Sequence, residues 1–97
     1  MLTHQHIISA TLSAGEWSEN VVLNSTELAS IIIIPTDANN TYTFKITSPD
    51  NNLIYSAKVT GRLDREPTRS LNGTYTLAIT GATIAGDTVN GELGFRR

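Results

Sequence analysis

The stretch from Thr41 to Val59 limits the possible folds more than any other part of the chain. Tyr42, Phe44 and Ile46 alternate there with threonines and a lysine. Successive side chains of a strand point to opposite faces, so this spacing predicts one apolar face and one wettable face. The next five residues, Ser48 to Asn52, have the composition of a turn. The return run has the same alternation, with an apolar parity made of Leu53, Tyr55, Ala57 and Val59. The stretch therefore predicts a β-hairpin with a five-residue loop.

The rest of the 97-residue chain favours strands as well. It has ten isoleucines and 14 threonines against one methionine, and no cysteine. β-Branched residues are enriched in strands, and a chain without cysteine uses no disulfides. Short apolar runs recur about every 8–12 residues, which is typical of a sandwich or barrel. We expect a single domain over residues 1–97, an all-β, antiparallel, jelly-roll-like β-sandwich of seven or eight short strands.

The remaining strands follow from the same alternation. Before the hairpin, the pattern predicts a strand over 6–12, a short strand over 19–23, a turn at 24–27 and a strand over 28–34 that Pro35 ends. After it, Tyr75, Leu77 and Ile79 share one face of a further strand. A final hairpin is expected from 83–85 and 89–95, with Gly91 as a bulge or a point of close approach.

Four consecutive isoleucines, Ile31 to Ile34, make one strand apolar on both parities. Such a strand is either covered on both faces or offers one face to a partner. A sandwich of this size has only one interior, so we expect the second face to meet a loop, an edge hairpin or another chain. Ile31 and Ile33 are the predicted interface positions.

A charge-dense segment, Gly61 to Ser70, is predicted to be a long surface loop. Its arginines, Arg62, Arg65 and Arg69, can each pair with carboxylates in a bidentate geometry suited to protein contacts. The alternative is a solvated loop whose opposite charges neutralise each other. Trp17 also has two interpretations: a core residue whose indole N–H finds a partner, or an exposed residue that stacks on a sugar or anchors an interface.

The residues do not suggest catalysis, a metal site or a cofactor. No serine lies in a Gly-x-Ser-x-Gly context, and no glycine-rich phosphate loop precedes a helix. His4 and His6 share a strand face, but the chain has no other histidine or cysteine to complete a zinc or copper site. The Asp/Asn runs at 37–40 and 50–52 lack the pattern of a calcium loop and are explained by turns. We expect a protein that is not an enzyme.

Charge and hydropathy exclude two further classes of partner. The formal net charge is −2, and the basic residues form no stripe, so nucleic acid is not expected as a ligand. The longest apolar run has four residues, far fewer than the roughly 20 that a membrane span needs. No signal peptide is visible at the N-terminus.

Two segments carry a resemblance to known proteins. The runs Tyr42 to Asp50 and Gly73 to Gly81 resemble small jelly-roll-like modules. Such modules occur in secreted carbohydrate-binding domains, in peptidase-associated domains and in bacteriophage virion proteins. The chain as a whole, cysteine-free and rich in Thr, Asn and Ile, looks most like the phage group. That group includes capsid decoration (cement) proteins and small neck or tail components.

This resemblance implies a virion structural protein, assembled in the host cytoplasm and localised to the virion. It would pack on capsid, portal or tail subunits, or on copies of itself as a homo-oligomer. The alternative is a carbohydrate-binding module that uses Trp17 and the neighbourhood of Tyr42 and Tyr55. The resemblance assigns no functional residue.

Overall fold

The computed structural model describes residues 4–96 and has seven β-strands in that range. In chain order they are β1 (His4–Thr11), β2 (Trp17–Pro35), β3 (Thr41–Thr47), β4 (Leu53–Thr60), β5 (Leu63–Arg65), β6 (Arg69–Thr80) and β7 (Thr88–Arg96). All pairings are antiparallel. The expectation of an all-β antiparallel sandwich is confirmed.

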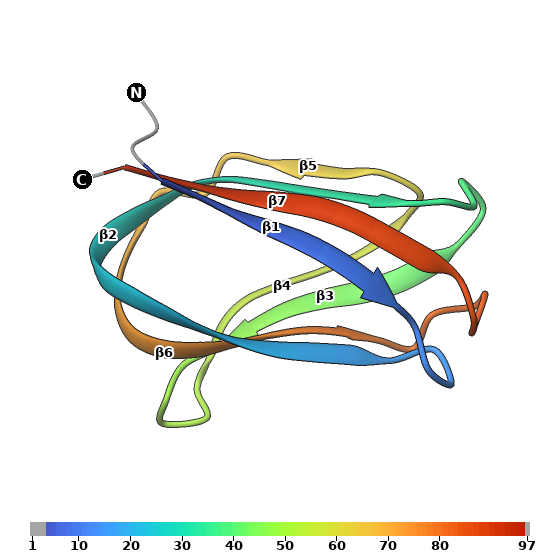
Figure 1. Ribbon diagram of the computed structural model, residues 1–97, viewed down its shortest axis with the longest axis horizontal. Coiled ribbons are helices and arrows are strands. Elements are labelled where there is room, and N and C mark those ends of the chain that lie inside the picture. The colour runs from blue at the N-terminus through green and yellow to red at the C-terminus, as the bar shows by residue number, and fades with distance from the viewer. Residues whose placement is uncertain (1–3, 97) are drawn as a thin grey trace.

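The strands form one hydrogen-bonded sheet that is folded into two layers, because β2 belongs to both (Figure 1). The first layer has the order β1-β7-β2-β5 and uses the C-terminal half of β2. The second has the order β2-β6-β3-β4 and uses the N-terminal half. In Figure 1, β2 runs along the lower layer, bends at the left and returns in the upper layer. The first layer therefore has β1 and β5 at its edges, and the second has β2 and β4.

The bend in β2 is made by a bulge. The register with β6 shifts between Leu23 and Thr26, and Ser25 between them has a φ of 44°. The N–H of Ser25 donates to Oδ1 of Asn72 at 2.9 Å, so the strand opposite fixes the bend. An extra residue in one strand increases its local bend and twist, and this carries β2 from one layer to the other. The turn expected at 24–27 is therefore a bend inside one 19-residue strand, and the two strands expected on its flanks are one.

The core lies between the layers and is made by alternate residues of nearly every strand. Its largest fully buried side chains are Tyr42, Phe44, Phe95, Ile8, Leu28, Ile31, Ile33, Ile46, Leu63, Leu77, Ile79 and Leu93. The predicted inward parity is confirmed for 8–12, for the first strand of the central hairpin and for 75–79. The central hairpin is confirmed, with its two strands and its five-residue connection. Its predicted apolar parity fails at Leu53, which is 58% exposed because the register shifts between Ile46 and Thr47.

The expected final hairpin is wrong. Residues 81–87 form no strand in the structure, and β7 pairs with β1 and β2 instead of a neighbour in sequence. Gly91 is a point of close approach without a register shift: a Cβ there would lie 2.5 Å from the carbonyl oxygen of Ile32 and 2.9 Å from Cδ1 of Ile33. Any larger residue at this position would collide with the strand beside it.

The side chain of Asn40 joins the loop between β2 and β3 to the segment between β6 and β7. These loops lie at the right-hand end of Figure 1. The Asn40 side chain is fully buried, its Nδ2 donates to Oδ2 of Asp87 at 3.1 Å, and its Oδ1 accepts from the N–H of Ile84 at 3.2 Å. Desolvation alone would raise the pKa of Asp87. The hydrogen bonds that its carboxylate accepts from Asn40 and from the backbone N–H groups of Asp37 and Thr88 outweigh it, so the pKa is lowered. The Asp/Asn run at 37–40 is thus used to join loops.

Candidate interaction surface

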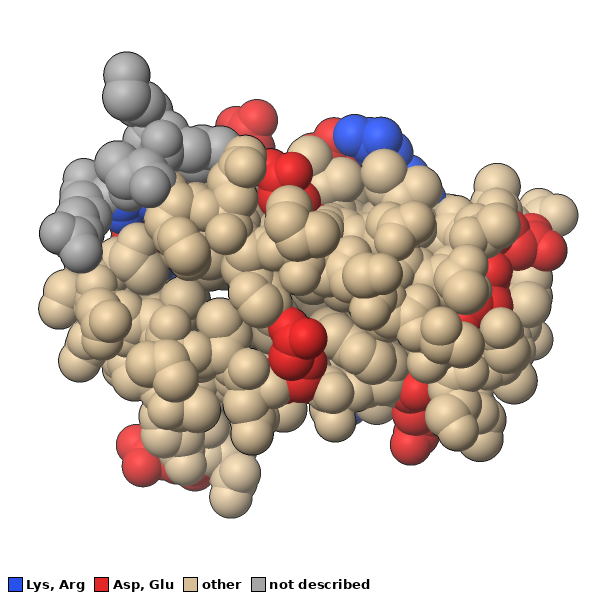
Figure 2. Space-filling model, viewed as in Figure 1, with Lys and Arg blue, Asp and Glu red and all other residues tan. Residues whose placement is uncertain are grey.

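Charged side chains are sparse on the molecular surface. On the face in Figure 2, acidic groups lie singly among uncharged atoms, and the basic groups in view do not gather into a patch. Exposed ion pairs among the described residues join Arg62 to Asp64 at 3.4 Å and Arg96 to Glu27 at 2.8 Å. Within residues 4–96, no helix is long and apolar enough to cross a bilayer.

The two histidines of β1 are occupied by separate neighbours. The His4 ring stacks on Phe95 of β7, with 5.6 Å between ring centroids. Nε2 of His6 contacts Oε1 of Glu19 across the gap between β1 and β2, where the edges of the two layers meet. In the part of the chain that the structure describes, no group of three or more His, Asp or Glu residues could hold a metal ion.

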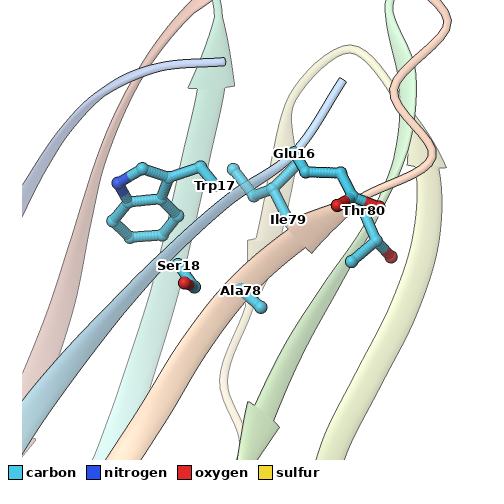
Figure 3. Close-up of a pocket in the computed structure, with 6 residues that line it drawn as sticks. All are labelled: Glu16, Trp17, Ser18, Ala78, Ile79 and Thr80. Atoms are coloured by element: carbon cyan, nitrogen blue, oxygen red, sulfur yellow. The ribbon is translucent and has the colours of Figure 1, made fainter. Parts of the chain in front are cut away.

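Trp17 begins β2 at the edge of the second layer and is half-buried against the core. It lines a shallow, open pocket of about 270 Å³ together with Glu16, Ser18, Ala78, Ile79 and Thr80. In Figure 3 the indole lies at one end of this group and Thr80 at the other. Trp17 thus packs on the core and also borders a depression with a mixed polar and apolar lining, and its role in binding stays a prediction.

Three outward isoleucines give the first layer an apolar outer face. The strand register sets Ile7 of β1 beside Glu92 of β7, and Glu92 beside Ile32 of β2. In the next row Asn90 of β7 lies beside Ile34 of β2. We call the surface made by these five side chains the isoleucine face.

The isoleucine face is open to solvent. Ile7 is 63% exposed and Ile34 is 41% exposed, while Ile32 between them is partly covered. The Glu92 carboxylate accepts a hydrogen bond from Nε2 of Gln5 at 2.7 Å, so its position on the face is fixed. The isoleucine face thus combines three aliphatic side chains with one carboxylate and one amide, those of Glu92 and Asn90.

The predicted interface positions Ile31 and Ile33 point the other way. Both are 0% exposed and belong to the core, where Leu63 of β5 packs from the neighbouring strand. The prediction chose the wrong parity, since four identical residues carry no signal of which alternate pair faces inward. Gly91 could have supplied that signal, because the close-approach glycine lies opposite Ile33.

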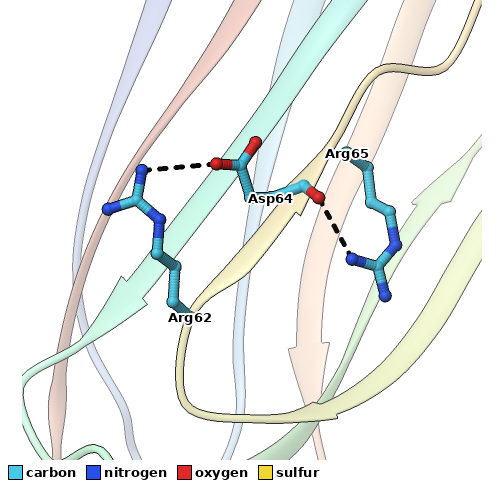
Figure 4. A network of polar contacts seen from close by, with 3 residues as sticks. All are labelled: Arg62, Asp64 and Arg65. Carbon is cyan, nitrogen blue, oxygen red and sulfur yellow. Dashed lines mark hydrogen bonds and ion pairs between the residues drawn. The ribbon is translucent and has the colours of Figure 1, made fainter.

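The segment 61–70 is only partly a loop, which corrects the expectation. Leu63 to Arg65 form β5, which pairs with Ile31 to Ile33 and closes the edge of the first layer. Asp64 lies beside Ile32 in this register and binds two arginines (Figure 4). Arg62 Nη2 is 3.4 Å from its carboxylate, and Arg65 Nη1 donates to its backbone carbonyl at 3.1 Å. Arg62, through its ion pair with the outward Asp64, thus borders the isoleucine face, whereas Arg65 pairs with the inward Ile31 and lies on the core side of β5.

The other two predicted residues lie elsewhere. Arg69 is exposed at the start of β6, paired in register with Leu28 near the bend. Trp17 is paired with Ile79 in the second layer. The predicted set is therefore divided, with Arg62 beside the isoleucine face, Arg65 on the core side of β5 and Trp17 on a different layer.

Comparisons with known proteins add information on the fold. No family model matches the chain, and no curated protein matches it. Among solved structures, it is similar to the Yersinia pseudotuberculosis-derived mitogen, with a TM-score of 0.58 and 10% identity over 97% of this chain and 86% of that one. It is also similar to part of dimeric latent PorU from Porphyromonas gingivalis, with a TM-score of 0.55 and 14% identity over 98% of this chain and 13% of that one.

A third similarity is to a chain in the structure of the Gx strain of infectious bursal disease virus. Its TM-score is 0.32, at 8% identity over 97% of this chain and 31% of that one. The first two similarities show a shared β-rich fold, and none of the three assigns a function.

Proposed function

We propose that this protein is a non-enzymatic structural protein of a bacteriophage virion, a capsid decoration (cement), neck or tail component. It acts by docking on another virion subunit. The observation that carries the proposal is the isoleucine face, on which Ile7 and Ile34 are exposed and Ile32 is partly exposed. The resemblance of the sequence to phage virion proteins supports the class of assembly.

The chemistry of docking is burial of aliphatic surface inside a polar rim. Ile7 and Ile34 have apolar area left to bury, and such burial drives most protein association. Arg62 and Asp64 lie beside Ile32, where charges act on orientation and association rate more than on affinity. The partner we expect presents a complementary aliphatic patch.

Location is tested first. Mass spectrometry of particles purified from a culture of the source and banded in a density gradient should find the protein in the particle fraction. Its presence only in the soluble fraction would remove the virion role.

The docking surface is tested with a matched pair of variants on β2. Ile34→Asp places a charge on the isoleucine face, and Val22→Asp places the same charge on the outer side of the other layer, where Val22 is 67% exposed. We expect Ile34→Asp to reduce incorporation into particles about tenfold or more, since an unpaired charge at an interface centre is costly. Val22→Asp should incorporate normally. Equal incorporation of both would show that the isoleucine face is not used.

The arginines are tested by a triple variant in which Arg62, Arg65 and Arg69 become Ala. The ion pair at Asp64 is exposed and contributes little to folding, so the melting temperature should stay nearly unchanged. Assembly should weaken, most visibly at low salt where electrostatic attraction is least screened. A triple variant that assembles normally would restrict docking to the isoleucines.

A carbohydrate-binding role is the second candidate, favoured by the pocket beside Trp17. An indole next to Glu16, Ser18 and Thr80 offers a stacking surface and hydrogen-bonding groups to a sugar. Tyr42, Phe44 and Tyr75 do not extend this site, since all three are buried. Binding on a glycan array that Trp17→Ala abolishes would favour this candidate over assembly.

A further inference from the structure

We infer that β4 is a docking edge, and that a second copy of this chain pairs with it to continue the second layer across two molecules. This inference deepens the proposed assembly function by naming where copies meet. It rests on that function for its biological role and on the geometry of β4 for its chemistry.

The first observation is the burial of β4. It runs for eight residues, Leu53 to Thr60, and none of them is buried. Each of the other six strands in the described range has at least one buried residue. Tyr55, Ala57 and Val59 point toward the core but are only half-covered. The core-side row of apolar side chains in β4 is thus only partly covered at this edge of the layer.

The second observation is that β4 lacks two features that protect the other edges from pairing. β5 has three residues, with Arg62 and Asp64 paired at its start. β1 and β2 turn His6 and Glu19 inward, and these two side chains contact each other between the layers. Short strands and inward-pointing charged groups are the usual means of preventing edge pairing. β4 has neither; its own protective features are one lysine, Lys58, and a register shift beside Leu53.

The backbone of β4 has groups free for pairing. The N–H of Gly61, which directly follows β4, donates to the carbonyl of Asn40, which directly precedes β3, at 2.9 Å. Hydrogen-bonded and non-hydrogen-bonded pairs alternate along an antiparallel ladder. From this register, Tyr55, Ala57 and Val59 bond to β3. Ser56, Lys58 and Thr60 therefore turn their N–H and C=O groups outward, away from β3.

The side chains of β4 are complementary to a second copy of the same strand. With a two-fold axis at Ala57, Tyr55 of one copy lies opposite Val59 of the other, and both belong to the core-side face. Aromatic and β-branched residues are a favourable cross-strand pair. Ser56 lies opposite Lys58 of the second copy, so the charged residues do not meet directly. The half-open apolar rows of the two copies then cover each other.

A matched pair of lysine substitutions tests this contact. Ser56→Lys would place like charges opposite each other twice in the symmetric pair, and Ser18→Lys adds the same charge at the opposite edge of the same layer. Both serines are exposed. In sedimentation velocity across a concentration series, we expect wild type and Ser18→Lys to dimerise alike. Ser56→Lys should raise the dimer dissociation constant about tenfold or more. A wild type that stays monomeric, or equal dimerisation of all three proteins, would overturn the proposal.

In Ser56→Lys the new charge also lies beside Lys45 of β3, which pairs with Ser56 inside one molecule. A second variant, without added charge, therefore tests the contact separately. Ser56→Pro removes an outward N–H without removing a bond to β3, a position at which edge strands tolerate proline. It should also abolish the dimer. Hydrogen exchange should show the amides of Ser56, Lys58 and Thr60 becoming protected as wild-type concentration rises. Unchanged protection, or a dimer that persists in Ser56→Pro, would place the contact elsewhere.

The proposed virion role and the proposed dimer through β4 can be disproved independently of each other. Ile34→Asp should leave the dimer intact while reducing incorporation into particles. Loss of the dimer in Ile34→Asp would instead assign self-association to the isoleucine face and overturn the role of β4. A dimer that responds to Ser56→Lys, in a protein absent from particles, would keep the edge contact and remove the virion role.

Discussion

β3 and β4 are neighbours with the same alternating pattern, yet their side chains are buried to different extents. In β3 the inward residues Tyr42, Phe44 and Ile46 are all buried. In β4 the corresponding apolar residues, which pair with them in register, are half-exposed. The two strands would be given the same burial from their sequences.

The difference arises from position in the sheet. β3 lies between β6 and β4, so its inward side chains have neighbours on both sides as well as the opposite layer above them. β4 has β3 on one side only. Alternation decides which way a side chain points, and the neighbouring strands decide how much of it is covered. The predictions below test this contrast, from the largest expected effect to the smallest.

The largest effect is expected from Phe44→Ala in β3. Phe44 is 0% exposed, and removing a buried aromatic ring costs its transfer free energy plus that of the cavity left behind. We expect the free energy of unfolding to fall by about 3–5 kcal/mol, measured by urea denaturation. The counterpart in β4 is Tyr55→Ala, whose half-buried ring should cost about half as much. Equal losses would show that position in the sheet does not set the burial.

A smaller effect is expected from Tyr42→Phe. The Tyr42 hydroxyl donates to the carbonyl of Gly61 at 2.7 Å in a buried setting, and its removal leaves that acceptor unsatisfied. The free energy of unfolding should fall by about 1–2 kcal/mol at neutral pH. Tyr55→Phe should change it by less than about 0.5 kcal/mol, as is usual for substitutions at open positions.

The same tyrosine gives a pH dependence. Burial raises the pKa of Tyr42 from 10.0 to about 12, against the opposing effect of a backbone hydrogen bond with Leu63. Because the folded state holds this proton more tightly, its contribution to stability is full below about pH 10 and is lost between pH 10 and about 12. Unfolding curves across this range should show a loss for wild type that Tyr42→Phe reduces. Parallel curves would mean that Tyr42 is not the group responsible.

The smallest effect is expected from Val59→Ala in β4. Two half-covered methyl groups account for about 1 kcal/mol in a monomer, less than the same truncation would cost in β3. Thermal unfolding in dilute solution measures that monomer value. If β4 pairs with a second copy, the loss should grow as protein concentration rises, since Val59 then contacts Tyr55 of the other chain. A loss independent of concentration would argue against that contact.

Local sequence patterns predicted the central hairpin. Elsewhere the predicted strands and loops were wrong where the structure depends on contacts between residues far apart in the chain. The hairpin depends on alternation and on a turn that lies between its two strands, so all its determinants are contiguous. β5 pairs with β2 across some thirty residues of chain, and nothing in Leu63 to Arg65 alone distinguishes three paired residues from a charged loop. For the same reason the interface prediction took Ile31 and Ile33 for outward residues, whereas both are buried.

The sequence by itself determined the all-β class, the central hairpin and most of the inward parity, because strand alternation and turn composition act over a few neighbouring residues. The tertiary structure decided the rest. The bulge at Ser25 and its bond to Asn72 place the two halves of β2 in different layers. That placement directs Ile32 and Ile34 outward and leaves β4 at an edge. These outcomes depend on which strands become neighbours, and neighbours are chosen by contacts between residues far apart in the chain.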